Sequence, residues 1–132
     1  MKKYIVLVFM LSIIVTGCFG ERGAGKLYTK CYKEINTSYL KETDTYDIYY
    51  REGDIFDIII TKKYDGMDMK NEINTYKKMY ESDAINITTT DNSITYNFDL
   101  SLISDDIKDT FNIKYRYNDE IKKLKELGFT CE

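Results

Sequence analysis

Histidine, proline and tryptophan are absent from the 132 residues of the chain. Without histidine, the Ser–His and Cys–His pairs that activate a nucleophile cannot form, and no G-x-S-x-G segment occurs. Tyrosine, isoleucine, asparagine and lysine are abundant instead, a bias that an AT-rich genome explains. Any enzymatic activity would therefore have to rely on carboxylates.

One unbroken apolar run stands near the N-terminus, over residues 4–15. Lys2 and Lys3 precede it and small residues follow it, which is the order of a secretory signal. The run is short for a membrane-spanning helix, which needs about 20 residues. We therefore expect residues 1–17 to form a signal peptide that is removed.

The end of this run, Val15, Thr16, Gly17 and Cys18, resembles the lipobox of a bacterial lipoprotein precursor. In such a precursor the cysteine thiol receives a diacylglycerol group and becomes the mature N-terminus. Each buried acyl methylene contributes ~0.8 kcal/mol, and stable anchoring takes more than one chain. The motif predicts a protein anchored through Cys18 to the outer face of the cytoplasmic membrane. A plain secretory signal or an uncleaved anchor is the alternative.

Residues 18–26 combine three glycines with charged side chains, which predicts a flexible tether after the lipidated cysteine. Gly20, Gly25 and Lys26 also match the G-x-x-x-x-G-K skeleton of a phosphate-binding loop. Leu27 stands where that loop requires Ser or Thr, and the segment follows a cleavage site instead of a buried strand. Neither a nucleotide nor any other cofactor is expected.

The charge balance is acidic. The net charge is −3, and removal of Lys2 and Lys3 with the signal peptide makes it more negative. An acidic chain argues against nucleic acid as a partner and against electrostatic docking on anionic lipid, both of which require clustered basic residues. The membrane contact would then rest on the acyl chains of Cys18. An envelope protein, a peptide or a sugar stays open as a further partner.

Once Cys18 is assigned to lipid, Cys31 and Cys131 remain. Outside the cytoplasm two such cysteines are expected to form a disulfide, which would join the first strand to the C-terminal tail. For a closed loop of about 100 residues the chain-entropy model gives ~4.7 kcal/mol of stabilisation. A metal site is the alternative, but two thiols without histidine make a poor ligand set for zinc.

Alternating apolar residues predict a single α+β domain over residues 27–132. A polar loop is expected over residues 36–44, and turns are expected at Glu52-Gly53-Asp54 and at Asp65-Gly66. The expected strands are 27–33, 46–50, 55–64, 85–89 and 94–100.

Asp68 can cap a helix after the third strand. The apolar face of this helix would comprise Met69, Ile73, Tyr76 and Tyr80. We interpret this stripe as a core face that covers the sheet, with a groove for a partner as the alternative. A short helical turn is expected over residues 104–111.

Asn118 can cap a last helix, which directs Ile121, Leu124 and Leu127 inward, and Gly128 is well placed to end it. The resulting order, β-β-β-α-β-β-α, predicts an antiparallel sheet of about five strands with the helices packed on one face.

With this order of elements, the chain resembles the YehR-like family of small lipoproteins. The resemblance depends on Cys31, on the turn at Gly53-Asp54 and on the closing Gly128-Phe129-Thr130-Cys131. It implies the same strand and helix order after a lipobox, and a Gram-positive source. It assigns no catalytic residue.

Carboxylate pairs are the remaining candidates for catalysis. Glycoside hydrolysis uses two carboxyl groups ~5 to 9.5 Å apart, and either Asp44 with Asp47 or a set of Asp105, Asp106 and Asp109 could supply them. A solvated acidic surface is the simpler interpretation. Calcium has candidate ligands in Asp65, Asp68 and Glu72, although their spacing differs from that of an EF-hand.

Exposed tyrosines could stack on a sugar or a peptide. The candidates are Tyr49, Tyr64, Tyr115 and Tyr117. The sequence as a whole favours a membrane-anchored extracytoplasmic lipoprotein that serves the cell envelope as a non-enzymatic binding or accessory module. The alternatives are a carboxylate-dependent cell-wall hydrolase and a purely structural envelope protein.

Overall fold

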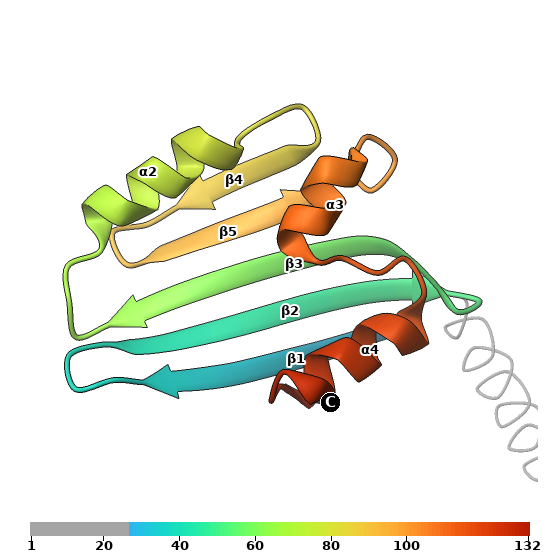
Figure 1. Ribbon diagram of the computed structural model, residues 1–132, viewed down its shortest axis with the longest axis horizontal. Coiled ribbons are helices and arrows are strands. Elements are labelled where there is room, and N and C mark those ends of the chain that lie inside the picture. The colour runs from blue at the N-terminus through green and yellow to red at the C-terminus, as the bar shows by residue number, and fades with distance from the viewer. Residues whose placement is uncertain (1–26) are drawn as a thin grey trace, which may run out of the picture.

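The computed structural model describes residues 27–132, which form a single six-stranded antiparallel sheet with three helices on one face (Figure 1). This confirms the predicted α+β class and the placement of the helices. The predicted signal peptide 1–17, the lipobox Val15-Thr16-Gly17 with Cys18, and the tether lie outside the described residues. Within residues 27–132, no helix is long and apolar enough to cross a membrane.

The sheet has the strand order β4-β5-β3-β2-β1-β6. Its strands are β1 (Leu27–Asn36), β2 (Lys41–Arg51), β3 (Asp54–Asp65), β4 (Ile85–Thr89), β5 (Ser93–Phe98) and β6 (Thr130–Cys131). The helices are α2 (Lys70–Tyr80), α3 (Asp105–Phe111) and α4 (Tyr117–Glu126). The predicted order is therefore confirmed, with α3 at the expected helical turn and β6 as an additional strand.

β6 is a two-residue strand beside β1, where Cys131 pairs with Cys31 and Thr130 with Tyr32. The two cysteines lie at disulfide distance, as the sequence predicts, with their Cα atoms 4.0 Å apart. Backbone hydrogen bonds between Lys30 and Glu132 continue the pairing. The C-terminal tail is thus held against the edge of the sheet.

The predicted loop over residues 36–44 is wrong for most of its length. β1 continues to Asn36 and β2 already begins at Lys41, so that residues 37–40 alone connect them. The polar side chains of this segment find partners across the strands, because Asp44 lies opposite Lys62 on β3. Strand pairing and charge pairing here outweigh the low β-propensity of the sequence.

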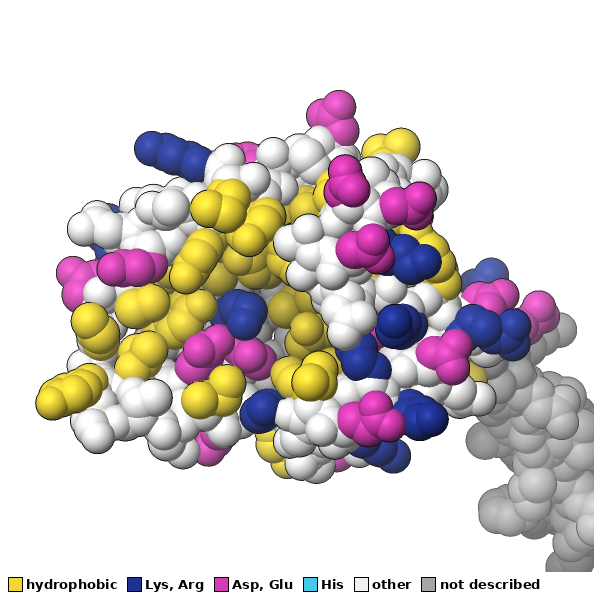
Figure 2. All heavy atoms as spheres, in the orientation of Figure 1, with side chains coloured by type: hydrophobic (Ala, Val, Ile, Leu, Met, Phe, Trp, Pro, Cys, Tyr) yellow, Lys and Arg dark blue, Asp and Glu magenta, His cyan; other side chains and the backbone are white. Residues whose placement is uncertain are grey.

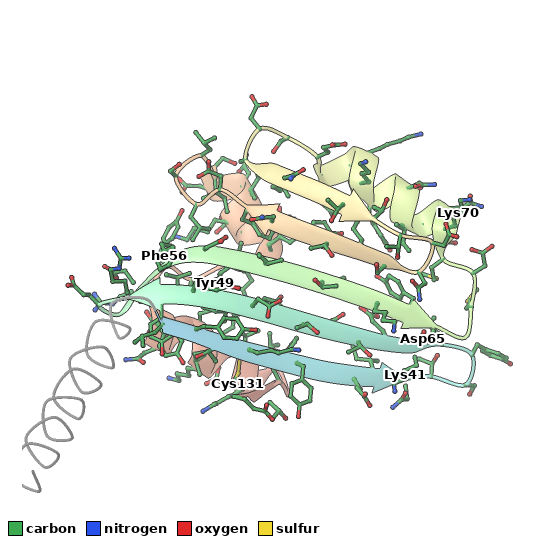
Figure 3. The ribbon with its side chains drawn as sticks, turned by 180° about the vertical axis from the view of Figure 1, so that it is seen from behind. Lys41, Tyr49, Phe56, Asp65, Lys70 and Cys131 are labelled. Atoms are coloured by element: carbon green, nitrogen blue, oxygen red, sulfur yellow. A yellow bond between two sulfur atoms is a disulfide. The ribbon has the colours of Figure 1, made fainter. Side chains whose placement is uncertain are left out.

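The core lies between the sheet and the helices, as the alternation of the strands dictates. Ile73 of α2 and Leu124 of α4 are buried against it. From the sheet the most deeply buried side chains are Cys31, Ile48, Ile58, Ile60, Ile85 and Ile94. Figure 3 shows the opposite face of the sheet, which no helix among the described residues covers.

The ends of the helices differ slightly from the prediction. α4 begins at Tyr117 with Arg116 as its N-cap, ahead of the expected Asn118. Leu127, predicted to point inward, is 51% exposed because α4 ends at Glu126 and Leu127 is its C-cap. Gly128, with φ of 93°, then turns the chain towards β6, as predicted.

The turn glycines are confirmed as well. Gly53 closes the β2–β3 hairpin with φ of 82°, and Gly66 follows β3 with φ of 101°. A Cβ at position 66 would lie 2.9 Å from the carbonyl oxygen of Tyr39, in the loop between β1 and β2. The close approach of this loop is therefore a second reason why position 66 requires glycine.

Candidate functional site

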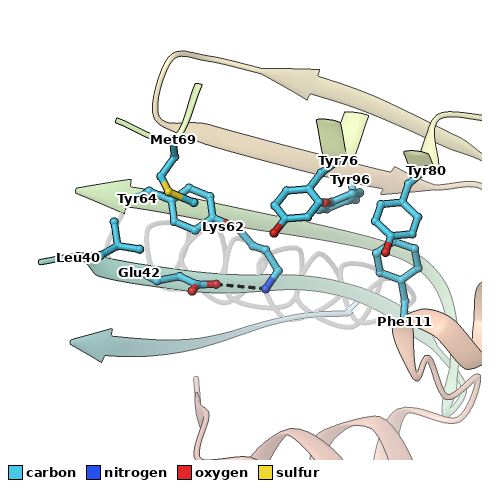
Figure 4. Close-up of a pocket in the computed structure, with 9 residues that line it drawn as sticks. All are labelled: Leu40, Glu42, Lys62, Tyr64, Met69, Tyr76, Tyr80, Tyr96 and Phe111. Atoms are coloured by element: carbon cyan, nitrogen blue, oxygen red, sulfur yellow. Dashed lines mark hydrogen bonds and ion pairs between the residues drawn. The ribbon is translucent and has the colours of Figure 1, made fainter. Parts of the chain in front are cut away.

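The helices cover their face of the sheet incompletely and leave a groove beside α2 (Figure 2). The groove has a volume of about 330 Å³, within the range of small-ligand pockets. Figure 4 shows the residues that line it: Leu40, Glu42, Lys62, Tyr64, Met69, Tyr76, Tyr80, Tyr96 and Phe111.

Strand and helix periodicity place these side chains together. Residues two apart on a strand share a face, so Lys62 and Tyr64 of β3 both point towards the helices. Tyr76 and Tyr80 lie four apart on α2 and therefore project from one side of the helix. The stripe predicted as a core face is thus divided, since Ile73 is buried in the core whereas Tyr76 and Tyr80 line the groove.

Lys62 and Glu42 line the floor of the groove, and the buried Asp44 pairs with the same lysine. The Nζ atom of Lys62 lies 3.2 Å from Oε1 of Glu42 and 3.3 Å from Oδ2 of Asp44. Glu42 and Asp44 are two residues apart on β2, and both face Lys62 on the neighbouring strand. We call these three residues the charged floor.

Burial shapes the electrostatics of the charged floor. Asp44 is only 7% exposed. Burial and, to a smaller extent, the neighbouring Glu42 raise the pKa of Asp44 to about 6, against the opposing effect of Lys62. Burial alone would lower the pKa of Lys62, but the two carboxylates outweigh it and raise the pKa above its ordinary value. Lys62 is therefore firmly charged, while one of its partners is an unusually weak acid.

One oxygen of the charged floor has no partner. Oδ1 of Asp44 is the only buried side-chain nitrogen or oxygen atom within residues 27–132 that lacks a hydrogen bond. Buried polar atoms are normally satisfied, because leaving one unpaired costs about 1–3 kcal/mol. Oδ1 of Asp44 is enclosed by the protein, and the carboxylate beside it is that of Glu42.

Aromatic rings form the wall of the groove. Phe111, the last residue of α3, packs its ring edge-on against Tyr80 at 5.1 Å and tilted against Tyr96 at 5.2 Å between centroids. Burial raises the pKa of Tyr96 to about 12, so its hydroxyl stays protonated at neutral pH. The wall is therefore uncharged and rich in π faces.

The structure separates Asp44 from Asp47 and leaves the other predicted carboxylates on the surface. Asp44 and Asp47 are three residues apart on β2 and point to opposite faces, and Asp47 accepts a hydrogen bond from the Tyr28 hydroxyl on the uncovered face. Asp105, Asp106 and Asp109 lie on the exposed surface of α3. The carboxylate that does lie beside Asp44 is Glu42, which the sequence-based prediction missed because it placed residue 42 in a loop.

Of the four tyrosines predicted as candidates for ligand stacking, only Tyr64 lines the groove. Tyr117 stacks on Tyr50 at 3.7 Å and shares a hydrogen bond with Thr29. Tyr115 lies under the ammonium group of Lys108. Tyr49 packs against Tyr28 and Phe56 on the uncovered face.

The calcium candidates do not form a ligand set. Among residues 27–132, no group of three or more Asp, Glu, Cys or His side chains could hold a metal ion. Oδ1 of Asp68 instead accepts the backbone N–H of Lys70 at 3.0 Å, although Met69, and not the predicted Asp68, is the N-cap of α2.

No family model, curated protein or solved structure matches the chain. The fold and the groove together define a small α+β protein, with its C-terminus tied to the first strand and an aromatic groove over a charged floor.

Proposed function

We propose that the protein is a lipid-anchored lipoprotein of the bacterial cell envelope, similar to the YehR-like family, and that it acts as a non-enzymatic binding module. The groove is the observation that carries the binding half of this proposal. It combines aromatic rings with a paired carboxylate and lysine on a face that is otherwise packed, which is the composition of a ligand site. The lipobox at Val15-Thr16-Gly17-Cys18 supports the anchoring half.

A carboxylate-dependent cell-wall hydrolase is the second candidate, and the raised pKa of Asp44 favours it, because a general acid must stay protonated near neutral pH. The geometry argues against it. Both carboxylates bind the same ammonium group, so Lys62 occupies the space in which a scissile bond would have to lie. We therefore prefer the binding module.

Replacing Cys18 by alanine is expected to abolish lipid attachment. The chain would then lose its only predicted acylated thiol and remain an unprocessed precursor without diacylglycerol. Mass spectrometry of the protein extracted from membranes, with and without globomycin, measures both effects. The Cys31→Ala/Cys131→Ala variant is the control and should still be acylated. A wild-type protein without an acyl group on Cys18 would contradict the anchoring proposal.

Placing a photoreactive residue in the groove is expected to trap its ligand. Tyr76 and Tyr32 are both 36% exposed, but Tyr76 lines the groove and Tyr32 lies on the uncovered face of the sheet. With p-benzoylphenylalanine at position 76, ultraviolet irradiation of whole cells should give an adduct of higher mass. The same residue at position 32 should give several-fold less. Equal labelling at the two positions would argue against the groove as the binding site.

A further inference from the structure

The charge of the groove disfavours anionic ligands. Lys62 is the only cation among the residues that line it, and two carboxylates already bind its ammonium group. Glu72 adds a further acidic group on the rim, since it shares an adjoining hollow of about 190 Å³ with Tyr76. A ligand with negative charge would find no free cation there and would be repelled by the excess of carboxylates.

The unused hydrogen-bonding capacity of the charged floor consists mainly of acceptors. Glu42 lines the groove, and of its two carboxylate oxygens Oε1 pairs with Lys62. A ligand that supplies N–H donors would bind the carboxylate of Glu42, and one that also carries positive charge would balance the second carboxylate of the charged floor. Lysine ammonium and arginine guanidinium groups meet both conditions.

The groove is longer than a single basic group requires. A second hollow of about 190 Å³ adjoins it at the other end of α2, where Met79 and Ile107 join Tyr80 and Phe111. Leu40 and Met69 continue the apolar lining at the opposite end (Figure 4). Flexible methionines and tyrosines are typical of surfaces that bind polypeptide side chains.

We propose that the groove binds a polypeptide segment of another protein in which a lysine or arginine stands between apolar side chains. The basic group would reach Glu42, and the apolar neighbours would pack on Tyr76, Tyr80 and Leu40. This inference rests on the proposed binding function and names its ligand. Charge complementarity selects the basic residue, and the line of adjoining hollows selects an extended chain.

A random peptide library displayed on phage and selected against the full detergent-solubilised chain tests this inference. Enriched peptides should contain a basic residue flanked by apolar ones. In a synthetic copy of an enriched peptide, replacing lysine by the uncharged norleucine should weaken binding about ten-fold, the scale of a lost charge pair in a desolvated site. Glu42→Gln in the protein should have a similar effect.

Glu34→Gln is the matched control, because Glu34 pairs with Lys41 on the uncovered face and should leave peptide affinity unchanged. If Glu42→Gln were to unfold the protein, the norleucine peptide would still test the inference on the wild-type chain. Peptides that lack basic residues but lose binding in Tyr76→Ala would overturn the inference and leave the binding function intact. The inference would also be overturned if no peptide were enriched, or if the protein bound sugars or acyl chains in place of peptides. The photo-crosslink at position 76 tests the binding function separately.

Discussion

Replacing Cys31 and Cys131 together by alanine should lower the free energy of unfolding by about 4.7 kcal/mol, the value that the chain-entropy model gives for a loop of about 100 residues. The two cysteines are separated by 100 positions, so their bond restricts nearly the whole described chain in the unfolded state. The loss is a large share of the ~5–15 kcal/mol that stabilises a typical domain. Urea unfolding of the oxidised wild type and of the double variant measures it.

Reduction provides the control for this prediction. A reductant should shift the urea midpoint of the wild type towards that of the double variant and should leave the double variant unchanged. Reduction also weakens the attachment of the C-terminal tail in the native state, because β6 contributes only two residues to its pairing with β1. An unchanged midpoint after thiol titration has shown complete reduction would contradict a structural role for the bond.

The sequence predicted those parts of the fold in which burial alternates along the chain. The hairpin of β4 and β5 has apolar residues at every second position, because one of its faces meets the core and the other meets water. The turns at Gly53 and Gly66 were equally predictable from the sequence, since both glycines adopt positive φ angles that favour this residue. In these segments local chemistry and tertiary structure agree.

Where tertiary pairing overrides local preference, the prediction failed. Lys41 to Asp44 is polar and reads as a loop, yet it is the first part of β2 because Asp44 finds Lys62 across the strand. β6 is too short to show any periodicity and exists through its contact with β1. Neither contact can be read from the neighbouring sequence.

The same errors hid the candidate site. In a loop, the side chains of Glu42 and Asp44 need not point the same way. On a strand, their spacing of two residues places both side chains on one face. Tyrosine is so frequent in this chain that composition cannot separate Tyr76 and Tyr96, which line the groove, from Tyr117, which stacks on Tyr50. The strand register and the position of α2 supply that distinction.

Glu120→Ala is expected to lower the free energy of unfolding by about 3–5 kcal/mol, as when one partner of a buried ion pair is removed. Glu120 is 0% exposed, and its two oxygens have separate partners. Oε1 lies 2.5 Å from Nζ of Lys123, and Oε2 accepts the backbone N–H of Lys114 at 2.8 Å. Lys123 also donates to the carbonyl of Asn112, so this cluster joins α4 to the chain that leads from α3.

Three further variants separate the buried charge from the helix itself. Glu126→Ala changes an exposed carboxylate on the same helix and should alter the free energy of unfolding by no more than ~0.5 kcal/mol.

Burial lowers the pKa of Lys123 against the influence of Glu120, so the lysine is the group left without compensation when the carboxylate is removed. Glu120→Leu combined with Lys123→Met should therefore be less destabilising than Glu120→Leu alone, because it removes both charges. The recovery should be incomplete, since the N–H of Lys114 and the carbonyl of Asn112 still lack their partners. Urea unfolding of the four proteins beside the wild type measures these differences, and a Glu120→Ala variant as stable as Glu126→Ala would contradict the role assigned to the cluster.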